Sequence, residues 1–326
     1  MSNKKVSIIT STYNLLSNGR KGFFYECFRS IHEQDYPYIE HVIVDGKSND
    51  GSVEYIKSII NRYAKKEVVF ISEKDNGIND ATNKGVAKSS GDYVILMCDD
   101  DFYTRKYSIS KLVKAIENNN ADFSCASGWW LNKKVWSAKI NSFAYRHPFL
   151  INAFLIKKEL LKGEIYLDPK FPLVGDYDLF MRLLKKDGVK GAEVNDVLTV
   201  LRPGGYSQSD DEQYINEITT IIANNMEVKN LFSKEELWSL HCFNPTYFTL
   251  LKLYLFCKNR KIRESLFSVY DKRFLRKNFA RKFEYIIFFK FITKYFKKKK
   301  SKPKIKPDYT FAKSIEWIET FYRDIY

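Results

Sequence analysis

Residues 6–14 read VSIITSTYN, an apolar run of strand length that passes directly into a polar turn. The same pattern returns at residues 41–51, HVIVDGKSNDG, and at residues 93–101, YVILMCDDD. Continuous apolar strands that alternate with amphipathic helices are typical of a parallel sheet covered on both faces. The sequence therefore predicts an α/β fold with a Rossmann-like, mostly parallel central sheet and flanking helices. Its first elements are expected at residues 6–10, 23–34, 41–45, 53–63, 68–71, 78–88 and 93–97.

Polar residues follow each of the four predicted parallel strands, at residues 10–14, 45–51, 72–77 and 99–101. Turns are commonly polar, so one such loop is weak evidence for a site. The carboxyl ends of parallel strands meet at one edge of the sheet, and ligands of open α/β sheets bind at that edge. Four polar loops along one edge therefore indicate a binding site.

The second half of the chain is less regular than the first. Strands are expected at residues 122–130 and 135–140, a helix at residues 175–186, and a further strand within residues 189–200. From about residue 221 onward the sequence is helical in pattern, aromatic and increasingly basic. We therefore expect a different kind of structure beyond that point.

The formal net charge of +15 comes entirely from the end of the chain. Residues 251–326 contain 22 Lys+Arg and 7 Asp+Glu, whereas residues 1–250 contain 32 of each. Because residues 1–250 are neutral and residues 251–326 are basic, we expect the basic segment to bind an anionic surface. The chain is thus predicted to consist of an α/β domain at residues 1–220 and a helical, basic region at residues 221–326.

The composition of the chain also indicates the cellular compartment of the protein. No run of about 20 apolar residues is present, as a membrane-spanning helix would need, and the first residues do not resemble a secretory signal. The cysteines are scattered and show neither metal-site spacing nor a disulfide framework. The cysteines are Cys27, Cys98, Cys125, Cys242 and Cys257. Scattered, unpaired cysteines of this kind fit a reducing cytoplasm.

Three consecutive carboxylates, Asp99, Asp100 and Asp101, end the fourth predicted strand. Their mutual repulsion is costly unless a cation or solvent relieves it. All-oxygen ligands favour a hard ion such as Mg²⁺ or Mn²⁺, and these ions commonly bind substrate phosphates as well. A solvated acidic turn is the alternative. The position at a strand's carboxyl end favours a metal site, and we expect the three side chains on an exposed rim.

Two helix starts carry polar residues that have more than one interpretation. Residues 75–85, DNGINDATNKG, place acidic and amide side chains at a helix start, where they either cap the helix or lie beside a diphosphate near Lys84. Asp176 and Asp178 open the helix predicted at residues 175–186. They either stabilise the helix dipole or supply a general base.

Taken in order, these segments resemble the inverting family-2 glycosyltransferases. The matching stretches extend over roughly residues 5 to 207, and an ordered set of motifs is more specific than any one of them. The resemblance implies the GT-A fold and inversion at the anomeric carbon. The segments that carry it are residues 7–14, 34–36, 40–51, 72–85, 99–101, 175–179 and 204–207.

The resemblance also implies a role for individual residues. Thr10 and Tyr13 would line a pocket for the nucleotide base, and Asp45 would hydrogen-bond that base. Asp99 would hold the ribose or the metal, Asp100 or Asp101 the metal, and Asp176 would be the general base. The residues expected along the donor's diphosphate and sugar are Asp75, Asn79, Asp80, Asn83 and Lys84.

The sequence departs from the family pattern at three positions. Met97 stands where Asn or Asp is frequent, Gly175 where Glu is frequent, and Asn79 where Tyr is frequent. These departures concern the donor more than the type of reaction. His147 resembles a histidine of the family near the acceptor cleft, but a lone histidine is more often structural, so we leave it outside the catalytic set.

The resemblance further implies the substrates. The donor would be a nucleotide sugar, with UDP as the expected nucleotide. The acceptor would be a hydroxyl of a glycan or lipid-linked glycan in bacterial surface polysaccharide synthesis. Two other classes stay open, a sugar-phosphate nucleotidyltransferase and a non-catalytic binding protein. A nucleotidyltransferase would usually have a basic, Gly-rich loop after the first strand, and residues 10–14 lack one. A binding protein for nucleic acid is disfavoured, because an acidic cleft repels phosphates.

The last region offers a membrane hypothesis. Residues 283–296, FEYIIFFKFITKYF, are apolar and aromatic, and the Lys-rich residues 297–304 follow. Such a helix can lie in the membrane interface with its lysines on anionic lipid. Packing against the α/β domain or a second subunit is the alternative. We expect a cytoplasmic protein that is peripheral on the inner face of the plasma membrane.

Overall fold

A computed structural model describes the chain as far as residue 265. Its described residues all belong to one unit, residues 1–269, and the second unit, residues 270–326, lies outside them. The predicted interfacial helix at residues 283–296 and the Lys-rich run therefore lie outside the described residues, as do Tyr206 and Ser207 of the last motif. The described ranges are 3–131, 134–144, 146–163, 165–205, 210–227, 231–242 and 245–265.

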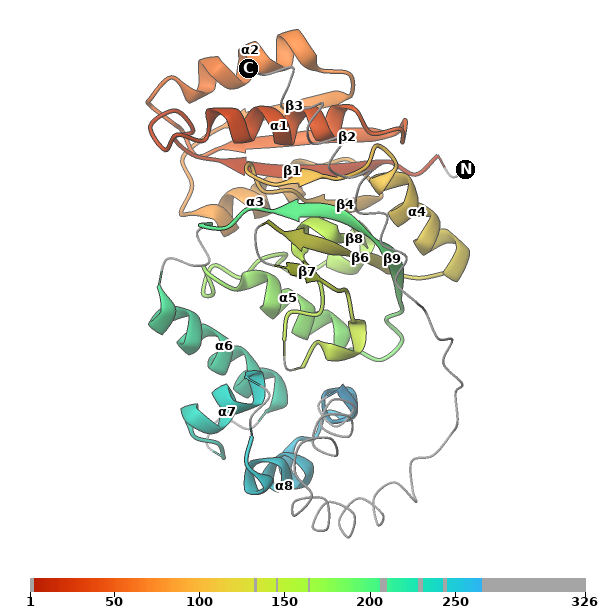
Figure 1. Ribbon diagram of the computed structural model, residues 1–326, viewed down its shortest axis with the longest axis vertical. Coiled ribbons are helices and arrows are strands. Elements are labelled where there is room, and N and C mark those ends of the chain that lie inside the picture. The colour runs from red at the N-terminus through yellow and green to blue at the C-terminus, as the bar shows by residue number, and fades with distance from the viewer. Residues whose placement is uncertain are drawn as a thin grey trace. The chain divides into compact units, whose positions relative to one another are not determined.

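The described strands form a single sheet, in the order β3-β2-β1-β4-β8-β6-β9-β5, and β7 pairs with β6 beside this path (Figure 1). The half formed by β3, β2, β1 and β4 is parallel, as predicted. The other half is mixed, because β8 runs antiparallel to β4 and β6 while β9 runs parallel to β6. The strands are β1 Val6–Thr12, β2 Ile39–Asp45, β3 Glu67–Ser72, β4 Tyr93–Leu96, β5 Phe102–Tyr103, β6 Phe123–Trp130, β7 Lys134–Trp136, β8 Phe154–Lys157 and β9 Gly191–Leu201.

The register of the parallel strands sets the position of the polar loops. Thr12 of β1 pairs with Asp45 of β2, and Asp45 in turn pairs with Ser72 of β3. These residues end their strands, so the loops that follow all leave the sheet at one edge. The predicted edge of polar loops is therefore confirmed for β1, β2 and β3.

Helices cover both faces of the sheet. Apolar residues of α1 and α4, among them Ile31 and Leu112, form one core with Ile8 and Ile95. On the same face α1 and α2 form a second core with β2. The α-helices are α1 Lys21–His32, α2 Ser52–Tyr63, α3 Ile78–Lys88, α4 Ser108–Asn119, α5 Gly175–Leu184, α6 Asp211–Met226, α7 Lys234–His241 and α8 Tyr247–Phe256.

On the opposite face α3 lies very close to β1. A methyl group on Gly85 would be 2.5 Å from Ile9 Cγ2, so a glycine is needed at this point of the helix. Ser11 of β1 and Thr82 of α3 share a hydrogen bond of 2.9 Å. The close approach fixes the start of α3, with its polar residues, against the end of β1.

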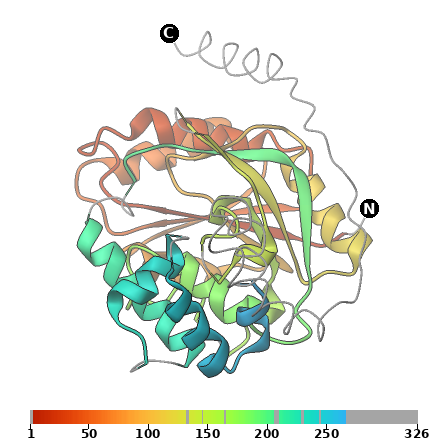
Figure 2. The ribbon, with the colours of Figure 1, turned by 60° about the horizontal axis from the view of Figure 1, so that its bottom comes forward.

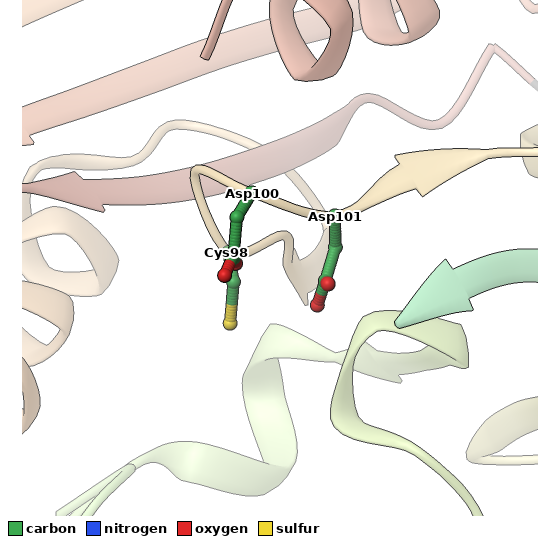
Figure 3. A group of neighbouring side chains, drawn as sticks. All are labelled: Cys98, Asp100 and Asp101. Carbon is green, nitrogen blue, oxygen red and sulfur yellow. The ribbon is translucent and has the colours of Figure 1, made fainter. Parts of the chain in front are cut away.

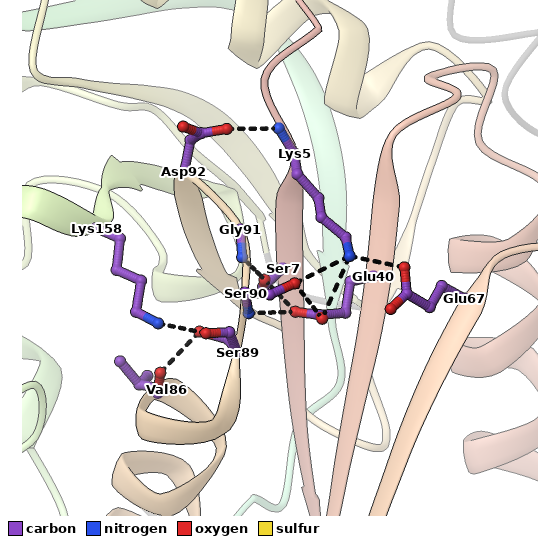
Figure 4. A network of polar contacts seen from close by, with 10 residues as sticks. All are labelled: Lys5, Ser7, Glu40, Glu67, Val86, Ser89, Ser90, Gly91, Asp92 and Lys158. Atoms are coloured by element: carbon purple, nitrogen blue, oxygen red, sulfur yellow. Dashed lines mark hydrogen bonds and ion pairs between the residues drawn. The ribbon is translucent and has the colours of Figure 1, made fainter.

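The edge where the parallel strands begin is closed by a polar network (Figure 4). Glu40 is buried and accepts hydrogen bonds from Ser7 Oγ at 2.5 Å and from Ser90 N at 2.8 Å. Lys5 pairs with both Glu40, at 3.5 Å, and Glu67, at 2.7 Å. The buried carboxylate of Glu40 is thus hydrogen-bonded, as buried polar groups usually are, and the network joins the beginnings of the four parallel strands.

The second half of the chain differs from the prediction in several elements. The strand expected at residues 135–140 is shorter, since β7 ends at Trp136 and residues 140–142 form a 3₁₀ turn. The helix α4 and the strand β8 were not predicted. The predicted domain boundary at residue 220 falls within α6, and the division into two regions stays a prediction.

The helices α6, α7 and α8 follow β9 and lie beyond α5 (Figures 1 and 2). A helical region was expected from about residue 221, and α6 begins earlier, at Asp211. Glu217 of α6 accepts hydrogen bonds from the backbone N–H groups of Leu173, at 3.0 Å, and Val174, at 3.1 Å. These bonds attach α6 to the segment that starts α5. No helix among the described residues is long and apolar enough to span a membrane.

Candidate active site

Tyr13, Gly46 and Asp75 meet at the carboxyl edge of the sheet, each on the loop that follows a different strand. A methyl group on Gly46 would lie 2.6 Å from Asp75 Oδ2 and 3.0 Å from Tyr13 Cδ2. The missing side chain at Gly46 therefore lets the ring and the carboxylate approach the same point. Because the Tyr13 side chain is 58% exposed, a flat ligand can reach it. Tyr13 and Asp75 were predicted to lie in the site, and Gly46 was not.

Asp45, at the end of β2, is fully buried and organises the loops on either side of it. It accepts hydrogen bonds from Ser48 N at 2.9 Å, Ser48 Oγ at 2.5 Å and Ser72 Oγ at 2.8 Å. Thr12 Oγ1 lies 3.5 Å from Asp45 Oδ1. Asp45 thus holds the loops that carry Tyr13 and Gly46, and its contact with a nucleotide base stays a prediction.

Thr10 is not brought to this edge. Its side chain is fully buried, and its Oγ1 lies 3.0 Å from His41 Nε2. His41 Nδ1 lies 3.2 Å from His32 Nε2, and His32 Nδ1 accepts from the backbone N–H groups of residues 65 and 66. Since His32 Nδ1 accepts, its proton is on Nε2, and a chain of hydrogen bonds runs from His32 through His41 to Thr10 in the interior.

Asp80 and Lys84 lie one turn apart on α3 and contact the loop before it. Asp80 Oδ2 accepts a hydrogen bond of 2.9 Å from Asn76 N, and this bond lowers the pKa of Asp80. Lys84 Nζ lies 3.4 Å from Asp80 Oδ2 and donates to Lys74 O at 2.6 Å. The ammonium group is therefore fixed beside the loop that carries Asp75.

Asn79 and Asn83, also on α3, hold the segment that leads into α5. Asn79 Nδ2 donates to the carbonyl oxygens of Asp168 and Phe171, each at 3.0 Å. Asn83 exchanges two hydrogen bonds with the backbone of Leu167, at 2.7 and 2.9 Å. These amides connect the α3 part of the site to the α5 part, and the predicted contacts of both residues with the donor stay predictions.

Arg20 joins the first two residues of the acidic triplet. One guanidinium nitrogen lies 2.7 Å from Asp99 Oδ1 and 2.6 Å from Asp100 Oδ2. Burial raises the pKa of Asp99 to about 7, against the opposing effect of Arg20. The cost of burying the charged carboxylate thus outweighs the attraction of Arg20, and Asp99 is protonated more easily than a carboxyl group in solvent.

Asp101 is held from two sides by protein groups. Its side chain is fully buried, accepts a hydrogen bond from Asn152 Nδ2 at 3.0 Å, and accepts another from Arg202 N at 3.0 Å. Arg202 also donates to the carbonyl oxygen of Asp100 and pairs with Glu26 of α1. The expectation that the triplet lies on an exposed rim is wrong for Asp99 and Asp101, because β4 and its turn are covered by α1 and by the residues after β9.

The turn after β4 offers carboxylates that fit a hard divalent cation. Cys98, Asp100 and Asp101 have potential ligand atoms within 4.8 Å of one another (Figure 3). Burial raises the pKa of Cys98 well above its usual value, so its thiol stays protonated and the carboxylates are the ligands that Mg²⁺ or Mn²⁺ would prefer.

The charges around the turn fit the same ion. When all are ionised, the carboxylates of Glu26 and of the triplet, residues 99–101, outnumber the guanidinium groups of Arg20 and Arg202 by two. A divalent cation would balance this excess. The residues present thus fit the predicted metal.

Asp176 and Asp178 lie on the first turn of α5 but have different partners. Asp178 is buried and pairs with Arg182 Nε at 2.6 Å, one turn along the helix. Asp176 Oδ1 accepts from Tyr177 N at 2.8 Å, and the Asp176 side chain is 25% exposed. Asp178 is therefore occupied by a structural ion pair, whereas Asp176 is accessible, which makes Asp176 the better candidate for a base.

His147 contacts this candidate base directly. His147 Nε2 lies 3.3 Å from Asp176 Oδ1, and the His147 ring lies on the Tyr177 ring with 5.0 Å between centroids. Sequence reasoning left His147 out of the site, and it also missed Arg20, Arg202 and Asn152. Their partners are far away in the sequence, so no local pattern could have found them.

Comparison with known proteins identifies the family. The model of glycosyl transferase family 2 matches residues 7–190 of the chain. The chain belongs to this family. The uncharacterized glycosyltransferase YwdF of Bacillus subtilis is 28% identical over 233 residues, which cover 66% of this chain and 83% of YwdF. Glycosyltransferase GlyA of Streptococcus pneumoniae is 29% identical over 131 residues, which cover 40% of this chain but only 17% of that much longer protein.

Solved structures agree with the predicted GT-A fold of this glycosyltransferase. S. aureus TarS 1–349 in complex with UDP-GlcNAc has a TM-score of 0.57 and 17% identity, over 73% of this chain and 71% of that one. The mannosyltransferase PcManGT from Pyrobaculum calidifontis, in complex with GDP-Man and Mn²⁺, has a TM-score of 0.54 and 15% identity, over 91% and 82%. At these identities the likeness establishes the fold alone.

Proposed function

We propose that this family-2 glycosyltransferase moves a sugar, with inversion, from a UDP-linked donor to a hydroxyl of a glycan or lipid-linked glycan. The observation that carries the proposal is the accessible carboxylate of Asp176, held by His147 at the start of α5. The nucleotide site at the carboxyl edge is connected to α5 through Asn79 and Asn83. A nucleotide site attached in this way to an accessible base is what transfer to a hydroxyl requires.

The nucleotide part of the donor is proposed to lie at Tyr13, Gly46 and Asp75. The exposed Tyr13 ring offers a face for a base, and Asp75 offers an acceptor for its N–H groups. TarS binds UDP-GlcNAc and PcManGT binds GDP-Man in the solved complexes, which supports a nucleotide-sugar donor in general. Lys84, fixed near the start of α3, is proposed to face the diphosphate, where a helix N-terminus also favours negative charge.

The reaction follows from the position of Asp176. Asp176 takes the proton of the acceptor hydroxyl while that oxygen forms a bond to the anomeric carbon of the donor. The bond from this carbon to the diphosphate oxygen breaks, and its electron pair leaves with the nucleoside diphosphate. A single displacement inverts the anomeric centre and needs no protein nucleophile. A divalent ion held by Asp100 and Asp101 would supply charge stabilisation for the leaving diphosphate, and PcManGT contains Mn²⁺.

We propose a glycan as the acceptor and a membrane surface as its location. The resemblance to transferases of bacterial surface polysaccharides supports a glycan acceptor. A lipid-linked glycan would place the enzyme at the cytoplasmic face of a membrane, and the net charge of +15 concentrated after residue 250 suits an anionic membrane surface. We therefore propose peripheral membrane association through the C-terminal region, residues 221–326, and above all through residues 283–304.

A donor screen tests the proposed function. The full chain is incubated with Mn²⁺ and one of UDP-glucose, UDP-galactose, UDP-N-acetylglucosamine or GDP-mannose, and release of nucleoside diphosphate is measured with and without an extract of lipid-linked glycans. We expect release with a uridine nucleotide sugar, faster in the presence of the extract. Release of pyrophosphate from UTP and a sugar 1-phosphate would instead indicate a nucleotidyltransferase. If no mixture shows either release of nucleoside diphosphate or release of pyrophosphate, the proposal is rejected.

A further inference from the structure

Asp176 is held in a way that leaves one of its two oxygens available. Tyr177 N donates to Oδ1 at 2.8 Å, and His147 Nε2 lies 3.3 Å from the same oxygen. Among the described residues, Oδ2 has no hydrogen-bond partner. Both protein contacts thus converge on Oδ1, and Oδ2 is the oxygen that can take a proton from an acceptor hydroxyl.

The His147 ring is itself fixed by its surroundings. It packs against the Tyr177 ring in a tilted arrangement, with 5.0 Å between centroids and 36° between the ring planes, and its side chain is 16% exposed. The His147 carbonyl oxygen accepts a hydrogen bond of 3.2 Å from Trp136 Nε1. The ring contact with Tyr177 and the backbone contact with Trp136 hold His147 where its Nε2 lies beside Asp176.

We propose that His147 is a positioning residue, which donates a hydrogen bond from Nε2 to Asp176 Oδ1 and thereby directs Oδ2 toward the acceptor. This inference rests on the proposed function, because it assigns to Asp176 the role of general base. Carboxylates and imidazoles pair in this manner where one group must hold the other in a fixed orientation. His147 does not touch the reacting atoms, so its effect is on the rate of proton removal and not on donor binding.

Two substitutions separate the hydrogen bond from the ring. His147→Phe keeps an aromatic ring on Tyr177 but removes the donor, and His147→Gln keeps an N–H donor at a similar reach but removes the ring. The substrate is whichever of UDP-glucose, UDP-galactose, UDP-N-acetylglucosamine and GDP-mannose gives the fastest release of nucleoside diphosphate with the wild type. We expect His147→Phe to lower kcat about 10-fold to 100-fold with an unchanged KM for this donor, and His147→Gln to restore much of the loss.

His241→Phe is the matched control. His241 contacts the same Tyr177 ring, with 5.7 Å between centroids, but has no contact with Asp176. The same chemical change at this position should leave kcat within about twofold of the wild type. An equal loss in His241→Phe and His147→Phe would mean that the ring cluster matters only for packing, and it would overturn the proposal.

A double-mutant cycle gives a readout that a purely structural role would not produce. In an Asp176→Asn background there is no base to orient, so adding His147→Phe should lower kcat no further. Multiplicative losses in the double variant, or full turnover in His147→Phe alone, would overturn the role of His147 while leaving the proposed function intact. A wild type that is inactive with all four donors would overturn the proposed function and this inference together.

Discussion

Asn79 of α3 and Gly175 of α5 approach so closely that a methyl group on Gly175 would lie 2.7 Å from Asn79 Nδ2. These are two of the three positions at which the sequence departs from the family pattern, and they lie against each other in the structure. A large side chain at either position would have no room while the other keeps its present place. The start of α5 therefore lies directly against α3 at these two positions.

Gly175→Ala is expected to lower the free energy of unfolding by about 1–3 kcal/mol, since the added methyl group displaces the Asn79 amide from two carbonyl oxygens. Urea denaturation monitored by circular dichroism measures this loss. Asn79→Ala removes the same bonds, so the double variant should be little less stable than Asn79→Ala alone. Additive losses would show that the two residues act independently.

Asp176→Asn is expected to reduce kcat by at least about 100-fold, because the amide cannot take up a proton. Binding of UDP, measured by calorimetry, should stay the same. Asp178→Asn is the matched control, since it removes the ion pair with Arg182 and should lower the melting temperature more than the rate. A mild effect of Asp176→Asn together with a large kinetic effect of Asp178→Asn would assign the base to Asp178.

Within the acidic triplet, Asp101 should be needed for the fold as well as for the proposed metal, and Asp100 for the metal alone. Asp101→Ala removes the acceptor of Asn152 Nδ2 and Arg202 N from a fully buried position. Unsatisfied buried donors cost about 1–3 kcal/mol each, so this variant should be clearly less stable in the absence of metal. Asp100→Ala should fold normally.

Binding of Mn²⁺ to the acidic triplet can be measured with the same variants. Mn²⁺ is expected to raise the melting temperature of the wild type, and this rise should disappear in Asp100→Ala. A ligand that binds only the folded state stabilises it in proportion to its concentration and affinity, so the shift should grow with Mn²⁺ concentration. An unchanged Mn²⁺ shift in Asp100→Ala would remove Asp100 from the metal site, and full activity of the wild type in excess chelator would exclude metal dependence.

The elements of the parallel half, and the edge at which their loops meet, could be predicted from the sequence, because their signals are local. Apolar runs and helical spacing fixed β1 to β4 and α1 to α3 within a few residues. The predicted end of β1 at Thr10 was two residues short, since the strand continues to Thr12. At about 3.3 Å per residue, this places Thr10 inside the sheet instead of at its edge.

The contacts that complete the site could not be predicted in the same way. Arg202 pairs with Glu26, His147 with Asp176, and Arg20 with Asp99, and each contact joins elements distant in the sequence. A single arginine or histidine carries no periodicity and no spacing that reports its partner. Only the packing of the folded chain brings these residues together.

The buried pair His32 and His41 is expected to make stability depend on pH. Burial lowers the pKa of His32 to about 4 and that of His41 well below its usual value. A base whose pKa is lowered by folding binds fewer protons in the folded state, so stability is complete above about pH 6.5 and is lost as the pH falls toward 4. For His32 alone the loss is on the order of 3 kcal/mol.

Urea denaturation at pH 7.5, 6.0 and 5.0 measures this loss. His32→Phe keeps the stacking position against Phe28, where the ring centroids are 4.0 Å apart, and removes one titrating group. Its stability should fall less between pH 7.5 and 5.0 than that of the wild type. The same pH dependence in both proteins would assign the loss to other groups.

The last prediction concerns the membrane. The helix α8 exposes three large apolar side chains, Phe248 at 63%, Leu255 at 62% and Phe256 at 45%. The 76 residues from 251 onward carry 22 Lys+Arg and 7 Asp+Glu. Each basic residue near an anionic surface contributes about 1 kcal/mol of attraction, so a cluster of this size should hold the enzyme there.

Flotation with liposomes tests this attraction. The full chain should float with vesicles that contain phosphatidylglycerol, stay behind with pure phosphatidylcholine, and be released by high salt because screening weakens the charge interaction. A chain that ends after Asn278 lacks the segment at 283–296 and the Lys-rich run, but keeps α8. It should not float. Equal flotation of both chains would place the membrane contact before residue 279, with α8 as the candidate, and flotation of neither would reject membrane association.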